Sequence, residues 1–254
     1  MFSFLWSGGM VWNVPLFIGL IIVGLVYTIV LRYLHEAERS HLKMVLFYSG
    51  LLLIYIIIGS PLSILKHSSF TVHMTYMSLL FFIVPPLLLM GIPLTFIERV
   101  KQLILKKFVI SHTITLLIFA CLFLLYHMSF MFNLFLQYPT LQTGYMLILF
   151  VLSLHVWSPL ITLNNENERS RYAALNNIVL MPACLIYVAT GLLGGMSIPF
   201  LSQFAELCVP DQSDLSILLP TWYNFRFDQV VAGIVMMGIH KLAIAITVKN
   251  RDRR

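Results

Sequence analysis

The sequence predicts an all-α integral membrane protein, a bundle of seven transmembrane helices with the N-terminus outside and the C-terminus in the cytoplasm. Hydrophobic residues make up 59% of the 254 residues and charged residues only 10%, whereas about a quarter of the residues of a soluble domain are charged. The apolar residues form long continuous runs that do not alternate with a period of two, which indicates helices and not a membrane β-barrel. The placement of lysine and arginine then sets the orientation.

Seven apolar runs reach, or nearly reach, the length that crosses the hydrocarbon core, which is about 20 helical residues at a rise of about 1.5 Å each. Together they form one polytopic membrane domain that covers residues 1–254. The predicted spans are 13–33, 44–60, 72–97, 108–127, 141–163, 178–198 and 227–248.

The spans differ in what interrupts or flanks them. The first is expected to be retained, because no basic residue precedes it and its apolar run is too long for a signal peptide. The second is short, and Pro61 extends its apolar surface. In the third, Pro85 and Pro86 remove two backbone donors, which predicts a kink that either lines a site or serves packing alone. The fourth is almost purely apolar in its middle, and the sixth carries Gly191 and Gly195 at a spacing that permits close helix packing.

Lysine and arginine gather in every second connection and in the C-terminal tail. The basic segments are 32–43, 98–107, 164–177 and 249–254. The opposite side carries only Lys66 and Arg226. Since basic residues stay in the cytoplasm, the N-terminus is predicted to be outside. The net charge of +6 follows from this topology and from anionic lipid, so no nucleic-acid partner is indicated.

Two pentapeptides share the order His-Met-hydroxyl-aromatic-Met: HMTYM, from His73 to Met77, and HMSFM, from His127 to Met131. The predicted topology puts both at the outer membrane face, on neighbouring antiparallel helices. The histidine and the second methionine are four residues apart, hence on one helix face, provided that the fourth helix continues past His127. Imidazole and thioether donors favour Cu(I), so these four residues are candidate copper ligands. The alternative is that the methionines fill gaps in the core and the histidines lie at the interface.

The stretch GSPLSILKHSSFTVHMTYMSLLFFIVPPLLLMGIPL, residues 59–94, resembles the most characteristic part of the CtaG family of cytochrome c oxidase assembly proteins. A second resemblance is FDQVVAG near the last helix, with Asp228, Gln229 and Gly233. The length and the helix plan also match. The chain departs from the family where Met77 replaces a second histidine and where Val230 follows the Asp-Gln pair, so it resembles a divergent member of the Gram-positive type.

The resemblance implies an assembly factor for a haem-copper terminal oxidase in the bacterial plasma membrane. Its partners would be an oxidase subunit or another assembly factor, and its cargo would be Cu(I). Asp228 would orient His73 or His127 by accepting a ring N–H; the alternative is an ion pair with Arg226 or Lys66. Two other functions stay open, a transporter of a metal or small molecule and a scaffold that binds an oxidase without metal.

No catalytic motif is present, so an enzyme is not expected. The longest outer connection, 199–226, is acidic and contains Cys208, the only cysteine predicted outside. It is expected to be a solvated loop, with docking of a partner as the alternative.

Overall fold

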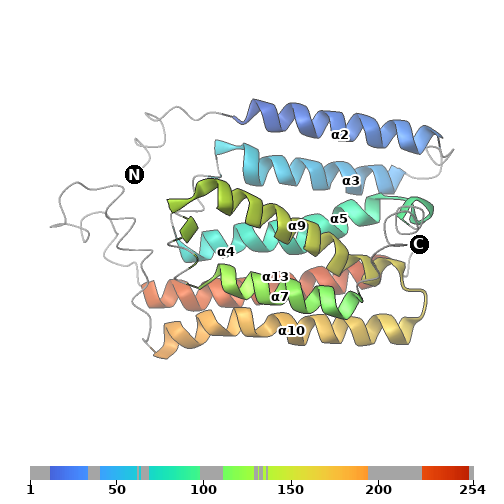
Figure 1. The fold of residues 1–254 in the computed structure, drawn as a ribbon. Coiled ribbons are helices and arrows are strands. Elements are labelled where there is room, and N and C mark those ends of the chain that lie inside the picture. The colour runs from blue at the N-terminus through green and yellow to red at the C-terminus, as the bar shows by residue number, and fades with distance from the viewer. Residues whose placement is uncertain are drawn as a thin grey trace.

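The computed structural model describes residues 12–33, 41–61, 63, 69–97, 111–128, 131, 134–135, 137–193 and 225–251, and these residues form helices and no strand. The predicted all-helical class is therefore confirmed for the described part of the chain (Figure 1). The helices, with η for a π-helical segment, are α2 (Val14–Tyr33), α3 (His41–Ile54), η2 (Tyr55–Gly59), α4 (Phe70–Ser78), η4 (Leu79–Ile83), α5 (Val84–Gly91), α7 (His112–Tyr126), α9 (Pro139–Thr162), α10 (Glu166–Leu193) and α13 (Phe225–Arg251).

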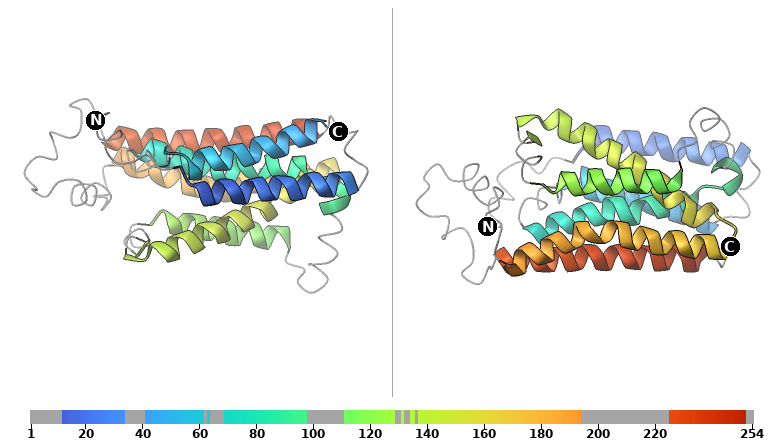
Figure 2. Two further views of the ribbon diagram at one scale, coloured as in Figure 1. Left: turned by 90° about the horizontal axis from the view of Figure 1, so that it is seen from above. Right: turned by 60° about the horizontal axis from the view of Figure 1, so that its bottom comes forward.

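The rod formed by α4, η4 and α5 lies in the middle of the bundle. It packs against α13, α3 and α9, and Figure 2 shows α7 and α9 on one side of it and α13 on the other. In the 18-residue apolar segment of this rod 72% is buried, against 17% in the corresponding segment of α2 at the periphery. The element that carries His73 is therefore surrounded by protein, while most of α2 is left to face lipid.

The central rod changes its helical geometry at its midpoint. Within η4 the bonding widens, and the amide of Val84 donates to the carbonyl of Leu79, five residues back. Pro85 and Pro86 follow in the first turn of α5. Pro85 has no N–H for the carbonyl of Phe81, four residues before it, and the indole Nε1 of Trp157 donates to that carbonyl at 2.9 Å instead. A neighbouring helix thus satisfies the backbone group that the proline leaves open.

Aromatic side chains fill the core around this midpoint. Phe81, Phe119 and Phe123 pack with their ring centroids 5.6 to 6.2 Å apart. Each of the three is at most 1% exposed. The three rings belong to the main hydrophobic core of the bundle.

Six helices are long and apolar enough to cross a membrane: Val14–Tyr33, His41–Gly59, Phe70–Gly91, Thr140–Thr162, Glu166–Leu193 and Arg226–Asn250. The predicted fourth span is described as the shorter apolar helix His112–Tyr126, of 15 residues. Consecutive helices run in alternating directions (Figure 1). The count of seven spans and the outside position of the N-terminus stay predictions.

Two predicted boundaries were wrong. The sixth span was predicted to begin at 178, but α10 begins at Glu166, so the predicted basic connection 164–177 is largely helical. The third was predicted to reach 97, but the helix ends at Gly91, where Ile92 turns to an extended conformation ahead of Pro93. The described residues do not include 194–224, so most of the acidic segment with Cys208 lies outside them.

Candidate functional site

The N-terminus of α4 is anchored by a carboxylate from α13. Asp228 accepts hydrogen bonds from the backbone N–H of Phe70 at 2.7 Å and of Thr71 at 3.4 Å, and from the hydroxyl of Thr71 at 2.7 Å. Ser69 accepts from the amide of Val72 at 3.2 Å. These acceptors serve amides that have no partner within the helix, and the negative charge lies at the positive end of the helix dipole. His73 follows in the same turn, so its backbone is fixed from outside its own helix.

His73 and His127 meet the same tyrosine, although they come from different helices. The His73 ring stacks on Tyr126, with 6.2 Å between centroids and 4° between planes. The His127 ring lies 5.4 Å from Tyr126, edge to face. The structure therefore brings the two predicted histidines into one cluster at one end of the bundle, as the proposed pairing of the pentapeptides requires.

The tautomer of His127 follows from its hydrogen bond. His127 caps the C-terminus of α7, and its Nδ1 lies 2.5 Å from the carbonyl oxygen of Phe123. A carbonyl can only accept, so Nδ1 carries the proton and Nε2 of the neutral ring carries the lone pair. Nε2 is buried and has no hydrogen-bond partner among the described residues. This buried lone pair is the atom of the cluster best suited to accept a hydrogen bond or to bind a metal ion.

Tyr187 of α10 also contacts the cluster. Its ring lies 5.4 Å from that of His127 and 5.9 Å from that of Phe70, and its hydroxyl lies 3.5 Å from the backbone oxygen of His127. The imidazole of His127 therefore makes T-shaped contacts with two tyrosines, Tyr126 and Tyr187.

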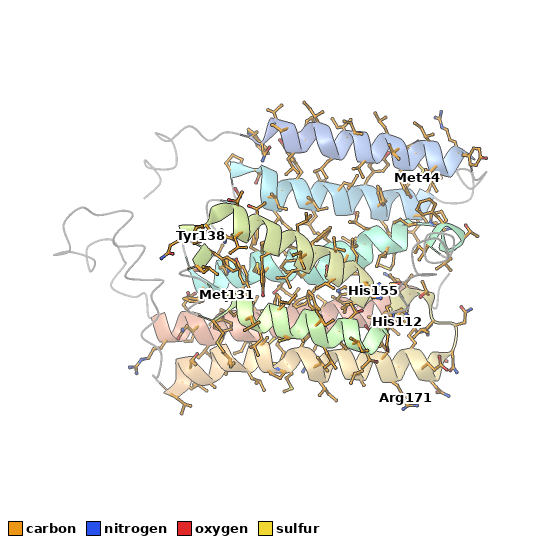
Figure 3. The ribbon with its side chains drawn as sticks, in the orientation of Figure 1. Met44, His112, Met131, Tyr138, His155 and Arg171 are labelled. Carbon is orange, nitrogen blue, oxygen red and sulfur yellow. The ribbon has the colours of Figure 1, made fainter. Side chains whose placement is uncertain are left out.

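The two predicted methionines are placed less favourably than the histidines. Met77 is fully buried, one turn along α4 from His73. Met131 is partly buried and packs on the main core, and Figure 3 shows it at the end of the bundle where α4 begins. The condition that the fourth helix continues past His127 is not met, because α7 ends at Tyr126. His127 and Met131 therefore do not share a face of one helix, and their approach depends on the turn that follows.

Asp228 has a further role at the site besides the two considered for it. Its contacts with Phe70 and Thr71 make it a cap of the helix that carries His73. Lys66 lies outside the described residues. A capping carboxylate can position the imidazole of His73 through the backbone, without touching the ring.

Sequence analysis missed the residues that line the cluster. Tyr126 directly precedes His127, and Tyr187 is a polar side chain in an otherwise apolar run, which was a usable signal. Gln229, beside Asp228, is 1% exposed, and its Nε2 is buried without a hydrogen-bond partner in the described part of the chain. Among the described residues no group of three or more His, Cys, Asp or Glu could hold a metal ion, so a metal here would depend on histidine with thioether or neutral donors.

The family assignment comes from comparison with known proteins. The family model of the cytochrome c oxidase caa3 assembly factor (Caa3_CtaG) matches residues 25–248. The chain belongs to this family. Comparisons with curated proteins and with solved structures gave no match. The match covers all the described elements from the second half of α2 to α13, including both histidines and Asp228, and so confirms the resemblance to CtaG proteins.

Proposed function

We propose that this CtaG-family chain helps to mature a copper-containing caa3-type oxidase by holding Cu(I) at the cluster of His73 and His127. The observation that carries the proposal is the Nε2 lone pair of His127, which is buried and has no partner among the described residues, beside the tyrosine on which His73 stacks. Copper is the cargo, to be passed on to a client protein.

The donor set suits a transient carrier. Imidazole and thioether ligands are neutral, so a singly charged ion is bound without a compensating anion, and thioethers are weak enough to exchange. The hydrogen bond to the carbonyl of Phe123 holds the His127 ring in the tautomer that leaves Nε2 able to coordinate. Such outer hydrogen bonds orient metal-ligating histidines in known metal sites. Asp228 supports the same site by fixing the start of α4.

The test is a competition titration of the detergent-purified protein with Cu(I) under reducing conditions. We expect the parent to bind one equivalent of copper at this site. The variant His73→Ala/His127→Ala should no longer bind that equivalent of copper. His41→Ala is the matched control, because His41 is exposed at the start of α3 and its loss should leave binding unchanged. Identical copper binding by the parent and by a folded double variant would overturn the proposal and would favour the scaffold function.

A further inference from the structure

Tyr126 is the last residue of α7, and its ring contacts the rings of both candidate copper ligands. The two contacts differ in geometry. The ring of His73 is parallel to that of Tyr126 within 4°, whereas the ring of His127 stands at 78° to it. Offset parallel packing is a favoured arrangement of aromatic rings, so the contact with Tyr126 favours one orientation of the His73 imidazole.

The ring of Tyr126 is itself firmly packed. It is 6% exposed, and the rings of Phe135 and Tyr145 lie 5.4 and 6.0 Å from it, measured between centroids. Its hydroxyl accepts a hydrogen bond from Nε2 of Gln142 at 3.4 Å. Gln142 and Tyr145 belong to α9, and the hydroxyl of Tyr145 donates to the carbonyl of Leu122 in α7 at 2.7 Å. The first half of α9 thus holds Tyr126 in place.

The two histidines are restrained in different ways. The ring of His127 is fixed by the hydrogen bond from its Nδ1 to the carbonyl of Phe123. For His73, the cap on α4 fixes the backbone, but a fixed backbone still allows several side-chain rotamers. Ordering a mobile side chain on binding costs free energy and weakens affinity. A neighbour that keeps the His73 ring in one orientation before copper arrives therefore strengthens binding.

We propose that Tyr126 is a positioning residue, which holds the imidazole of His73 in the orientation that binds Cu(I). The effect on copper rests on the proposed function, whereas the effect on the ring rests on the contacts alone. The restraint runs from α9 through Tyr126 of α7 to His73 of α4, so three helices set the orientation of one ligand. Tyr126 acts through His73 and not as a ligand, because its hydroxyl is bonded to Gln142.

The first experiment measures the order of each imidazole without copper. Full-length protein with ¹³C-labelled histidine is studied in detergent by nuclear magnetic relaxation. In the parent, we expect the His73 ring to have the order parameter of a rigid group, about 0.85. In Tyr126→Leu, which removes the aromatic ring, the value for His73 should fall below about 0.6. The value for His127 should stay high, because its bond to the carbonyl of Phe123 remains.

Phe119→Leu is the matched control, because it makes the same kind of change on the same helix. Phe119 is 1% exposed and packs against Phe81 and Phe123. Both histidine rings should stay ordered in this variant. Gel filtration and far-ultraviolet circular dichroism check that each variant is folded. A mobile His73 ring in the parent, or an equally ordered one in Tyr126→Leu, would overturn the proposal.

The second experiment titrates the same proteins with Cu(I) against a chelator. Tyr126→Leu should bind copper about tenfold more weakly, which corresponds to the cost of ordering one freed side chain. Tyr126→Phe, which keeps the ring, and Phe119→Leu should bind as the parent does. Equal losses of affinity in Tyr126→Leu and Phe119→Leu would also overturn the proposal. If the parent binds no copper, the proposed function fails, while the order of the His73 ring still decides whether Tyr126 positions it.

Discussion

Replacing Trp157 with phenylalanine tests how the bundle satisfies the carbonyl that Pro85 leaves without an amide. The substitution removes the donor that lies 2.9 Å from the oxygen of Phe81. An acceptor left buried and unsatisfied costs about 1–3 kcal/mol. The smaller ring adds about 1 kcal/mol, because Trp157 is only 1% exposed and its lost volume leaves a gap. We therefore expect the free energy of unfolding to fall by about 2–4 kcal/mol.

A second substitution isolates the hydrogen bond from the packing. Pro85→Ala restores an N–H that can reach the carbonyl of Phe81, so Trp157→Phe should cost about 1 kcal/mol less in that background. Pro182→Ala is the matched control, because it restores an amide inside α10 and not at the carbonyl of Phe81. The measurement is unfolding in mixed micelles with increasing dodecyl sulfate, followed by circular dichroism. If Trp157→Phe has the same cost in all three backgrounds, the indole does not substitute for the missing amide.

Two further predictions concern helix contacts. Asp228→Ala should lower the free energy of unfolding by about 2 kcal/mol, since the amides of Phe70 and Thr71 lose a charged acceptor. Asp228→Asn should recover part of the lost stability. If Asp228→Ala leaves unfolding in dodecyl sulfate unchanged, the capping role is contradicted. Gly191→Ala should cost about 1–3 kcal/mol, because a Cβ there would meet the backbone oxygen of Arg226 at 2.8 Å. Gly144→Ala is its control, because a Cβ at position 144 would meet nothing within 4 Å. This substitution should leave stability unchanged or raise it slightly. Equal losses of stability in the two glycine variants would refute the packing argument.

The fold class was predictable because burial in lipid imposes a strong requirement on composition. Hydropathy locates the part of a helix that lies in the membrane, but it does not locate the ends of the helix. The start of α10 shows the difference: residues 166–177 are polar, yet contain neither proline nor glycine, so the helix extends through them. Asn176 on this stretch is fully buried and accepts a hydrogen bond from His240 at 3.1 Å, a tertiary contact that no sequence window contains.

The candidate site was predictable only in part, for a similar reason. The pairing of His73 with His127 followed from topology, because helices joined by a short connection tend to pack together. The fourth span was predicted to end at 127, and α7 ends at Tyr126, so the continuation that would place His127 and Met131 on one helix face is not formed. The role of Asp228 depends on an approach between α13 and α4 that periodicity does not reveal.

The capping contact of Asp228 also has a consequence for biosynthesis. Phe70 and Asp228 are 158 positions apart in the chain, so the ribosome must finish the last helix before the amides of α4 receive their carboxylate. Until then the polypeptide already contains His73 and His127, but the turn that holds His73 lacks its external anchor. Completion of the cluster of His73 and His127 is thereby coupled to completion of translation. A prematurely terminated chain would enter the membrane with both histidines and without the carboxylate that fixes one of them.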